Sequence, residues 1–397
     1  MSNRVAVYCI DYYPSESGYS FAFQELVKGL LEHEDGLWVD VFTPVPLGSS
    51  AEVSQERLRV FRLNTPGTIA RVRYVRFLWA TFIRPWLCAR FIVARAKSEQ
   101  YRFILFESLD DYFVARFLPK RLRDRIIVRV HATSETEYAV WGPGFLQRMK
   151  FRVIRSLLRR SIRYIAATSA FHLAFVKRWY LNEDQLLMAD KRFMVIPNSV
   201  PTHPRASHSS AYPDNRINFL TLGRMDVLGA NQKGFDDILS SLALLPAESR
   251  RRVRFTFIGK GSERARLMGI ARVLEPAEIE FIESLPNQDV SRRLHDSDCI
   301  VLASRYEGMS IFALEAIAHG RPVIFSDAGG IADLVDGNGF RYPAGDAVQL
   351  SHAISRFLGL SNNERCALAK RSLEVASRFT SADSARRLMG FARLMGP

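Results

Sequence analysis

The feature that most constrains this chain is the repeated alternation of short apolar, β-branched runs with longer segments of helical periodicity. Such alternation is typical of parallel, doubly wound sheets, in which a helix connects each strand to the next. The runs predict strands at residues 5–10, 39–42, 103–106, 126–130, 164–167, 219–222, 255–258, 300–303 and 323–325. The expected fold class is therefore α/β, with parallel doubly wound sheets.

The length of the chain predicts two domains. Its 397 residues exceed what one hydrophobic core usually supports, and a hydrophobic content of 48% suffices for two cores. Residues 201–216 are rich in Pro, Ser and His and lack an apolar period, as expected of a linker. We therefore expect an N-terminal domain at 1–200 and a C-terminal domain that begins at residue 217.

The cysteines and the N-terminus favour a cytoplasmic protein. The four cysteines lie far apart, without the paired spacing of a metal site or a redox motif. Residues 1–3 lead directly into an apolar run, without the basic start, long apolar stretch and cleavage site of a signal peptide. The expected compartment is therefore reducing and intracellular.

The positive charge is concentrated in the first half of the chain. The net charge is +14, and residues 1–205 hold 31 Lys and Arg against 19 Asp and Glu, whereas residues 206–397 hold 24 against 22. A basic half of this kind indicates a polyanionic partner such as a membrane surface, nucleic acid or an acidic glycan. No nucleic-acid-binding module is recognisable, so we expect no nucleic-acid partner.

Two segments of this half are rich in basic residues and contain no carboxylate. Residues 69–97 interleave seven cations with aromatic side chains, and Pro85 interrupts them. Residues 147–164 place a cation at every third or fourth position and an apolar stripe on another side, which predicts a basic amphipathic helix. Either segment could dock on anionic lipid, or could be a solvated arginine face over a packed core stripe. Two such segments in one half favour a peripheral membrane protein.

Residues 304–322 contain the most informative chemical pattern. They follow one predicted strand and precede another, and they hold Glu307 and Glu315 with seven residues between them. A turn at Gly308 that opens a helix leaves the backbone N–H groups of Met309 and Ser310 at a helix N-terminus, which favours anions. Two carboxylates and these amides could hold sugar or ribose hydroxyls and a phosphate.

Two further clusters follow predicted strands. Arg224 and Lys233 come after residues 219–222, where a diphosphate needs positive charge. Gly259 follows residues 255–258 and would let a base or ribose approach the backbone closely. The Asp296-Ser297-Asp298 sequence resembles the D-x-D of metal-dependent transferases, but it precedes a predicted buried strand and is better interpreted as a turn into that strand.

Together these motifs resemble family 4 of the glycosyltransferases, enzymes of the GT-B fold. The resemblance rests on GRMD...KGF at 223–235, FIGKG at 257–261, EGMSIFALE at 307–315 and GRPVIFSDAGGIADLV at 320–335. In the first half it rests on YYPSESGYS at 12–20, VRVHATSE at 128–135, AATSAF at 166–171 and VIPNSV at 195–200. The loop between Arg224 and Lys233 is a few residues longer than usual for the family.

The resemblance implies a site and a mechanism. It implies two Rossmann-like domains that face a central cleft, with the donor site at 217–380, the acceptor site at 1–200, and a C-terminal helix at 381–397 that returns to the first domain. The implied reaction is retaining transfer of a sugar from a UDP- or GDP-sugar to a glycan or lipid-linked acceptor, without a metal or other cofactor. The implied contacts are Arg224 and Lys233 with the diphosphate, Glu307 and His131 with the sugar, Glu315 with the ribose, Leu285 with the base, and Gly18, Gly259, Gly308, Met309 and Ser310 with the donor through their backbone.

These features predict a hexosyltransferase of cell-surface polysaccharide or lipopolysaccharide synthesis on the inner face of the cytoplasmic membrane. The alternatives are a catalytically silent sugar-binding or scaffold subunit and a sugar-nucleotide epimerase. Retention of Arg224, Lys233, Glu307 and Glu315 together argues against a silent subunit.

Overall fold

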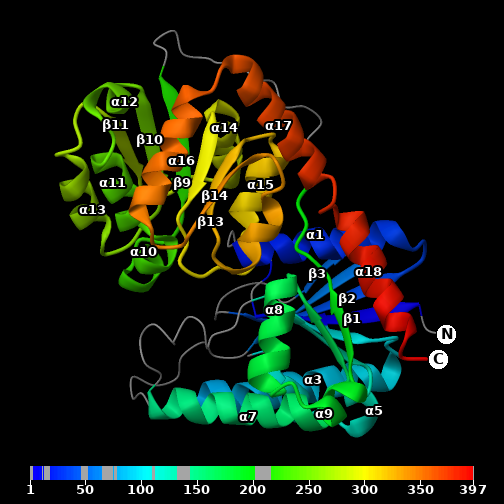
Figure 1. Cartoon of the computed structure of the whole chain (residues 1–397). Helices are drawn as coiled ribbons and strands as arrows, with labels where there is room; N and C mark the ends of the chain where they lie inside the picture. The colour runs from blue at the N-terminus through cyan, green and yellow to red at the C-terminus, as the bar shows by residue number, and fades with distance from the viewer. Residues whose placement is uncertain are drawn as a thin grey trace. The chain divides into compact units, whose positions relative to one another are not determined.

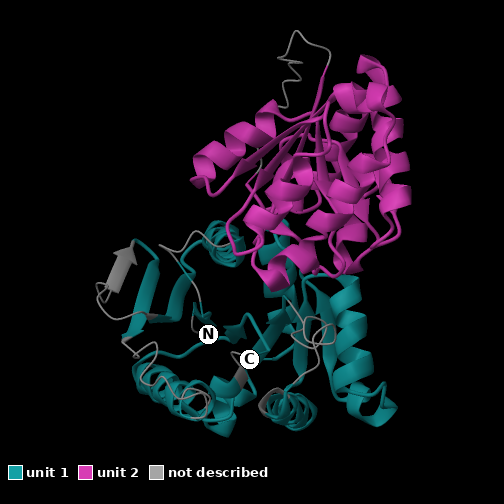
Figure 2. Cartoon of the chain, turned by 90° about the vertical axis from the view of Figure 1, so that its left-hand side faces the viewer, with its two compact units in different colours: residues 1–199, 381–397 teal, residues 200–380 magenta. Residues whose placement is uncertain are grey.

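The chain forms two compact units, shown in separate colours in Figure 2. Unit 1 comprises residues 1–199 and 381–397, and unit 2 comprises residues 200–380. The structure is a computed structural model that describes residues 3–10, 12, 18–45, 52–64, 75, 78–109, 112–131, 144–201 and 216–396. The predicted linker at 201–216 lies outside the described residues except at its two ends.

Unit 1 is built on an eight-stranded sheet in the order β3-β4-β2-β1-β5-β6-β7-β8. Every neighbouring pair is parallel except β3 and β4, which pair antiparallel at one edge. The strands are β1 (Arg4–Tyr8), β2 (Trp38–Val45), β3 (Glu52–Gln55), β4 (Leu58–Asn64), β5 (Ile104–Phe106), β6 (Ile126–Val130), β7 (Tyr164–Ala167) and β8 (Arg192–Val195).

Helices cover both faces of this sheet (Figure 1). One core layer contains apolar side chains of α1 and α18, and the other contains those of α3 and α7. The helical segments of the unit are α1 (Gly18–His33), η1 (Trp79–Ile83, a π-helical turn), α3 (Arg84–Ser98), α4 (Tyr112–Ala115), α5 (Lys120–Arg123), α7 (Phe145–Ser161), α8 (Ala170–Phe175), η2 (Val176–Tyr180, also π-helical), α9 (Gln185–Ala189) and α18 (Ser381–Arg393).

The C-terminal helix α18 belongs to unit 1 and packs along α1. A Cβ atom at Gly29 would lie 2.3 Å from the carbonyl oxygen of Ser381, so the two helices approach as closely as a glycine allows. The Ser381 hydroxyl donates a hydrogen bond of 2.9 Å to Glu25, and the Ser384 hydroxyl donates one of 3.0 Å to the carbonyl of Pro197. These contacts fix the last helix to the first.

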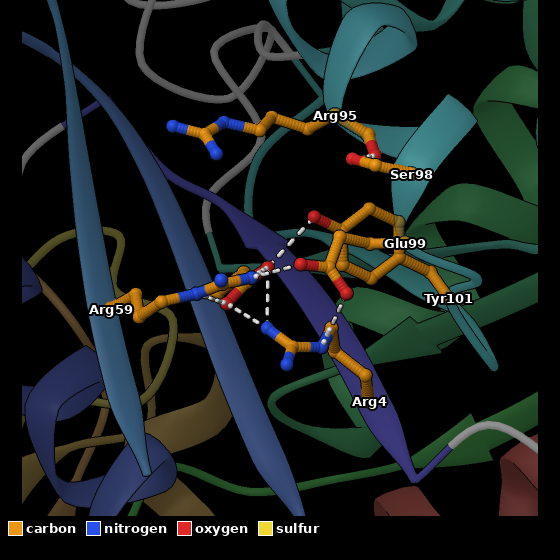
Figure 3. A network of polar contacts seen from close by, with 7 residues as sticks. Arg4, Arg59, Arg95, Ser98, Glu99 and Tyr101 are labelled. Atoms are coloured by element: carbon orange, nitrogen blue, oxygen red, sulfur yellow. Dashed lines mark hydrogen bonds and ion pairs between the residues drawn. The ribbon is translucent and has the colours of Figure 1, made fainter. Parts of the chain in front are cut away.

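A buried carboxylate ties strands of unit 1 together near the start of β1, as Figure 3 shows. Asp40 on β2 is fully buried and accepts hydrogen bonds from Arg4, Arg59 and Tyr101. Glu99 lies beside them and pairs with both arginines at 3.2 Å. Because each charge in this cluster has an opposite partner, we interpret it as structural rather than as a ligand site.

Helix α7 contains the basic amphipathic pattern that the sequence predicts at 147–164. Phe151, Ile154 and Leu158 are buried against the core of unit 1. Arg148 and Arg152 are exposed on the opposite side. The apolar stripe therefore packs in the core, and Arg148 and Arg152 are exposed to solvent.

The other basic segment begins outside the described residues and continues in η1 and α3. Pro85 lies in the first turn of α3, and α3 continues from η1 without a non-helical residue between them. Pro85 therefore does not end the helix, and the missing N–H falls where the π-helical turn passes into α3.

Unit 2 contains a six-stranded parallel sheet in the order β11-β10-β9-β12-β13-β14. Its strands are β9 (Ile217–Leu222), β10 (Val253–Ile258), β11 (Glu278–Ile282), β12 (Cys299–Leu302), β13 (Val323–Ser326) and β14 (Gly339–Tyr342). Its helical segments are α10 (Val227–Lys233), α11 (Phe235–Ala243), α12 (Ala247–Arg251), α13 (Arg264–Ala271), α14 (Asn287–Asp296), α15 (Ile311–Ala318), η3 (Gly329–Leu334), α16 (Ala347–Gly359) and α17 (Asn362–Ala376).

The predicted α/β class with parallel sheets is confirmed, and all nine predicted strands are present. Five further strands were not predicted, namely β3, β4, β8, β11 and β14. Four of these five lie at the edges of the sheets. In β11 the residues Glu278 and Glu280 alternate with apolar ones and are exposed, so no continuous apolar run marks such a strand in the sequence.

Candidate active site

The carboxyl edge of the unit 2 sheet brings the predicted donor-site residues together. Strands β10 and β11 lie on one side of β9, and β12 to β14 lie on the other. The strand order therefore reverses between β9 and β12, and open α/β sheets bind their ligands at such a switch point. Arg224 follows β9, and Glu307 follows β12.

Lys233 and Glu307 form an ion pair at this point. Lys233 is the last residue of α10, and its ammonium contacts the Glu307 carboxylate. The Ser304 hydroxyl donates a hydrogen bond of 3.2 Å to the same carboxylate oxygen. The two side chains keep 17% and 14% of their surface exposed, so a ligand at the sheet edge can still reach both. The fold thus joins two predicted site residues that lie 74 positions apart in the sequence.

A second ion pair, between Arg305 and Asp237, fixes the turn that holds Glu307. Arg305 contacts the Asp237 carboxylate with two nitrogens, at 3.1 and 2.7 Å. Its backbone N–H donates to the carbonyl of Gln232 at 2.8 Å, and its guanidinium reaches Asn231 at 3.0 Å. Two-point arginine–carboxylate pairs restrict orientation as well as distance. The turn after β12 is therefore anchored to α10 and α11.

Two glycines allow the strand ends to approach one another. Gly234 has a φ of +61°, and a Cβ atom there would lie 2.1 Å from the carbonyl oxygen of Ala303. A Cβ atom at Gly259 would lie 1.9 Å from the carbonyl oxygen of Gly223. Both distances are far below van der Waals contact, so a larger residue would force the backbone apart. The carbonyl of Gly223 already fills the space that a side chain at position 259 would need. Close packing therefore requires glycine at this position, in addition to the ligand contact that the sequence predicts.

Arg224 is the most accessible cation of the cluster, with 66% of its side chain exposed. Its nearest carboxylate is Asp226 at 3.5 Å. Asp226 also caps α10 by accepting the N–H of Gly229 at 2.9 Å. The extra residues between Arg224 and Lys233 thus form a short helix that places Lys233 beside Glu307.

Helix α15 begins immediately beyond the turn. Ser310 is its N-cap, and the hydroxyl accepts the N–H of Ala313 at 3.3 Å. Gly308 and Met309 lie between this cap and Glu307. The predicted glycine turn that opens a helix is therefore present.

Glu315 lies within α15 and is partly buried. Burial raises the pKa of its carboxyl to about 7. Among the residues that the structure describes, none gives this carboxyl a hydrogen bond or an ion pair. A half-buried carboxyl with a raised pKa and no partner is a candidate for binding a ligand hydroxyl. Leu285, the predicted contact of the base, follows β11 and is partly exposed.

Unit 1 holds a buried charged cluster at its own carboxyl edge. Glu107 follows β5, and Arg129 lies on β6, two residues before His131. The Arg129 guanidinium contacts Glu107 at 2.9 and 3.0 Å, and both side chains are fully buried. His131 Nε2 lies 2.9 Å from the guanidinium and in contact with the Glu107 carboxylate. Arg129 also donates to the Asn198 side chain at 3.3 Å.

The cluster sets the protonation of its members. Burial acts to raise the pKa of Glu107, but the charge of Arg129 and the hydrogen bonds from Arg129 and His131 outweigh it and lower that pKa. Burial and the Arg129 charge lower the pKa of His131. At neutral pH the geometry therefore favours a neutral imidazole beside an ionised Glu107. The Tyr19 ring packs edge-on against His131 with centroids 5.2 Å apart.

Sequence reasoning singled out His131 but missed Glu107 and Arg129. Arg129 is the one charged residue within an apolar strand, and Glu107 directly follows another strand. Those positions mark polar groups at a sheet edge, although nothing in the sequence shows that they pair. Gly18 is the first residue of α1, and residues 13–17 of its motif lie outside the described part of the chain.

Comparisons with known proteins show which families and folds the chain is similar to. Residues 216–359 match the family model described as glycosyl transferases group 1. Glycogen synthase of Mycobacterium tuberculosis is 24% identical over 213 residues, which are 53% of this chain and 48% of the relative. The matched region therefore spans about half the length of this curated relative.

Solved structures resemble the chain along almost its whole length. Sucrose-phosphate synthase from Thermosynechococcus elongatus has a TM-score of 0.77 at 19% identity, covering 99% of this chain and 98% of that chain. An α,α-trehalose-phosphate synthase from Burkholderia xenovorans has a TM-score of 0.69 at 13% identity, covering 98% and 100%. WaaG, a glycosyltransferase involved in lipopolysaccharide biosynthesis, has a TM-score of 0.67 at 16% identity, covering 99% and 100%.

At these identities the solved structures show the fold, which is GT-B with two Rossmann-like units. The match to the family model of glycosyl transferases group 1 covers residues 216–359, which is less than half of the chain. Together with the GT-B fold, this match supports the resemblance to family 4 glycosyltransferases that the motifs indicate.

Proposed function

We propose that this protein is a retaining glycosyltransferase that moves a sugar from a UDP- or GDP-sugar to a glycan or lipid-linked acceptor. The observation that supports this most directly is the Lys233–Glu307 pair at the switch point between β9 and β12. A cation and a carboxylate at this position match a donor that has an anionic diphosphate and a hydroxylated sugar.

In the proposed reaction, Arg224 and Lys233 bind the diphosphate and stabilise the charge that develops on it. The bond between the anomeric carbon and the β-phosphate oxygen breaks, and the acceptor oxygen bonds to that carbon on the same face. The acceptor proton passes to the departing phosphate oxygen. Charge stabilisation of this kind is usually the largest contribution to such catalysis. The step is proposed to need no metal and no other cofactor.

Glu307 is proposed to hold hydroxyls of the transferred sugar and to keep Lys233 in place. Its present contact with Lys233 neutralises both groups until the diphosphate arrives. The backbone N–H groups of Met309 and Ser310 at the start of α15 are proposed to contact sugar and phosphate, because a helix N-terminus favours anions.

Glu315 is proposed to accept hydrogen bonds from the ribose hydroxyls. An ionised carboxylate accepts hydrogen bonds from ribose hydroxyls more strongly than a protonated carboxyl does, so binding favours loss of the Glu315 proton. Leu285 is proposed to contact the base. His131 is proposed to contact the transferred sugar with a neutral ring nitrogen, which Glu107 and Arg129 orient.

The acceptor is proposed to be membrane-bound, in the synthesis of cell-surface polysaccharide or lipopolysaccharide on the cytoplasmic face. Support comes from α7, where Arg148 and Arg152 are exposed beside Phe145 and Met149, whose exposed fractions are 75% and 41%. Cations beside exposed apolar groups suit the surface of an anionic bilayer. In the described ranges, no helix is both long enough and apolar enough to cross a bilayer.

Flotation with vesicles tests the membrane proposal. We expect the wild type to float with vesicles that contain phosphatidylglycerol and to remain unbound with neutral vesicles. The variant Arg148→Gln/Arg152→Gln should bind more weakly by about 1 kcal/mol per removed cation. Equal flotation with neutral and anionic vesicles would show that this basic face does not select an anionic surface.

Thermal stabilisation tests the donor site. UDP, GDP, ADP and their sugar conjugates are compared on the wild type, Arg224→Ala, Glu315→Ala and the control Arg251→Ala, whose side chain lies exposed on α12. A nucleotide at about 100 times its dissociation constant should stabilise the fold by roughly 2.7 kcal/mol. We expect one nucleotide to stabilise the wild type and the control but neither site variant. Stabilisation of all four proteins alike would place the nucleotide elsewhere and remove the basis of the proposal.

A further inference from the structure

A second cationic site lies in unit 1, at the edge of the sheet opposite His131. A cavity of about 440 Å³ is lined by residues that immediately precede strands β6, β7 and β8, together with α5, the end of α7 and Met395. These strands are parallel, so residues before them lie at the amino edge. His131 follows β6 at the carboxyl edge, and a four-residue strand such as β7 separates the two edges by roughly 13 Å.

The lining of this cavity has an excess of positive charge. Two carboxylates line it, Asp124 and Asp190. Five cations also line it, namely Lys120, Arg123, Arg160, Arg163 and Lys191. Asp190 pairs with Arg163 at 3.0 Å. In the described part of the chain, Lys120, Arg123 and Arg160 have no ion pair. Among the described residues, several cations of this cavity therefore have no carboxylate partner.

Lys191 places a buried donor against the cavity. Only 5% of this residue is exposed, and its ammonium donates to the carbonyl oxygens of Arg159 at 3.1 Å and Ile162 at 2.7 Å. An ammonium has three N–H donors, so one remains after these two bonds. Among the described residues, none accepts that third hydrogen. Burial lowers the pKa of Lys191, and the neighbouring charge of Asp190 does not offset this effect.

A smaller basic cavity of about 360 Å³ adjoins the first along α7. The two cavities share Arg160, and the second is lined also by Arg152, Arg155 and Arg159. No carboxylate appears in its lining. The cationic surface thus continues from one cavity to the next.

We infer that the larger cavity, at the amino edge of the unit 1 sheet, binds a phosphate group, separately from the donor site of unit 2. Arginine forks and lysine ammonium groups together match the several oxygens of a phosphate. The volume lies in the range of ligand sites and leaves room for an organic group on the phosphate. The phosphate can belong to a soluble ester or to a lipid headgroup, and the chemistry at the cavity is the same for both.

Calorimetric titration with inorganic pyrophosphate tests this site. The titration uses the full chain with Arg224→Ala, which the proposed function expects to weaken diphosphate binding at the donor site. In that background we compare Lys120→Gln/Arg160→Gln with the control Arg121→Gln/Lys370→Gln, which removes the same charge from exposed positions outside both cavities. We expect the dissociation constant to rise at least tenfold in the first variant and less than twofold in the control. Equal affinity in the two variants would overturn the inference.

Two further probes distinguish the sources of the phosphate. Glycerol 3-phosphate tests a soluble ester, and vesicles with phosphatidylglycerol test a headgroup. Loss of binding to either probe in Lys120→Gln/Arg160→Gln, with binding retained in the control, supports the site and identifies its source. If neither probe nor pyrophosphate distinguishes the variants, the site does not exist. The donor site is tested separately. Each double variant is also made with Arg224 intact, and its thermal stabilisation by nucleotides is measured.

Discussion

The carboxyl edges of the two sheets arrange charge in different ways. In unit 2, Lys233 and Glu307 keep part of their surface exposed, and Arg224 extends into solvent. In unit 1, Glu107 and Arg129 are fully buried, and only His131 of that cluster retains some exposure, at 8% of its side chain. Both clusters lie at the carboxyl ends of parallel strands, so the difference lies in burial rather than in topology.

The difference separates two uses of an ion pair. A partly exposed pair contributes little to stability and can exchange its partner for a ligand. A buried pair is destabilising to break, because removal of one partner leaves an uncompensated charge in the protein interior. We therefore expect substitutions in unit 2 to change ligand binding and those in unit 1 to change stability first.

The largest effect is expected for Arg129→Met. Removal of the guanidinium leaves the buried Glu107 carboxylate without its main partner, so the free energy of unfolding should fall by about 3–5 kcal/mol. Denaturant unfolding of the full chain measures this change. The double variant Glu107→Gln/Arg129→Met should recover part of the loss, since it removes both charges. A single variant as stable as the wild type would show that the pair does not stabilise the unit.

The second effect concerns Lys233→Ala. Loss of its charge at the diphosphate should reduce the rate of sugar transfer by about 10²–10³-fold. Because the Lys233–Glu307 pair is partly exposed, the melting temperature should change little. Release of nucleotide diphosphate from the donor measures the rate, with the exposed Lys370→Ala as the control. A normal rate in the variant would show that Lys233 does not take part in sugar transfer. The partly exposed pair of unit 2 would then have no demonstrated role in ligand binding.

A third prediction uses two glycines of unit 2. Gly259→Ala forces a Cβ atom into the carbonyl of Gly223, so stability should fall by roughly 1–3 kcal/mol and nucleotide affinity should fall with it. Gly269→Ala, on helix α13, meets no atom within 4 Å and should instead stabilise by roughly 0.5–1 kcal/mol. Thermal unfolding with and without nucleotide measures both. Equal behaviour of the two variants would contradict close packing at the strand ends.

The smallest effect is a pH dependence at Glu315. The pKa of its carboxyl is about 7 in the free protein, and ribose binding should favour the ionised form. Nucleotide affinity should therefore be highest above pH 7 and fall up to tenfold per unit below it, or about 1.4 kcal/mol. Calorimetric titration from pH 5.5 to 8.5 measures this dependence. Glu315→Gln should bind weakly throughout and should show only the pH dependence of the nucleotide phosphate.

The folded protein favours the protonated form of Glu315 more than the unfolded chain does. This group therefore makes stability fall as the pH rises from the ordinary carboxyl pKa toward 7, with no further change above that value. Glu107 has the opposite sign, because its pKa is lowered. Its contribution is present above the ordinary carboxyl pKa and is lost as the pH falls below it.

The sequence by itself determined the fold class and the candidate donor site. Buried parallel strands require continuous apolar runs, so the central strands were visible, and the residues after them had to gather at one edge of a sheet. Arg224, Lys233, Glu307 and the helix start at Ser310 were found in this way. Edge strands such as β11 were missed because their exposed faces are polar.

Only the tertiary structure decided which charges pair and which are buried. Residues such as Glu107 and Arg129, or Lys233 and Glu307, are distant in sequence, and their contacts depend on strand order and loop geometry. The cationic cavity beside Lys191 likewise combines α5, the end of α7 and the residues that precede three strands. The charged residues can be counted in the sequence. The free energy of each charged group, however, depends on its burial and on neighbouring charges, and these are set only when the chain folds.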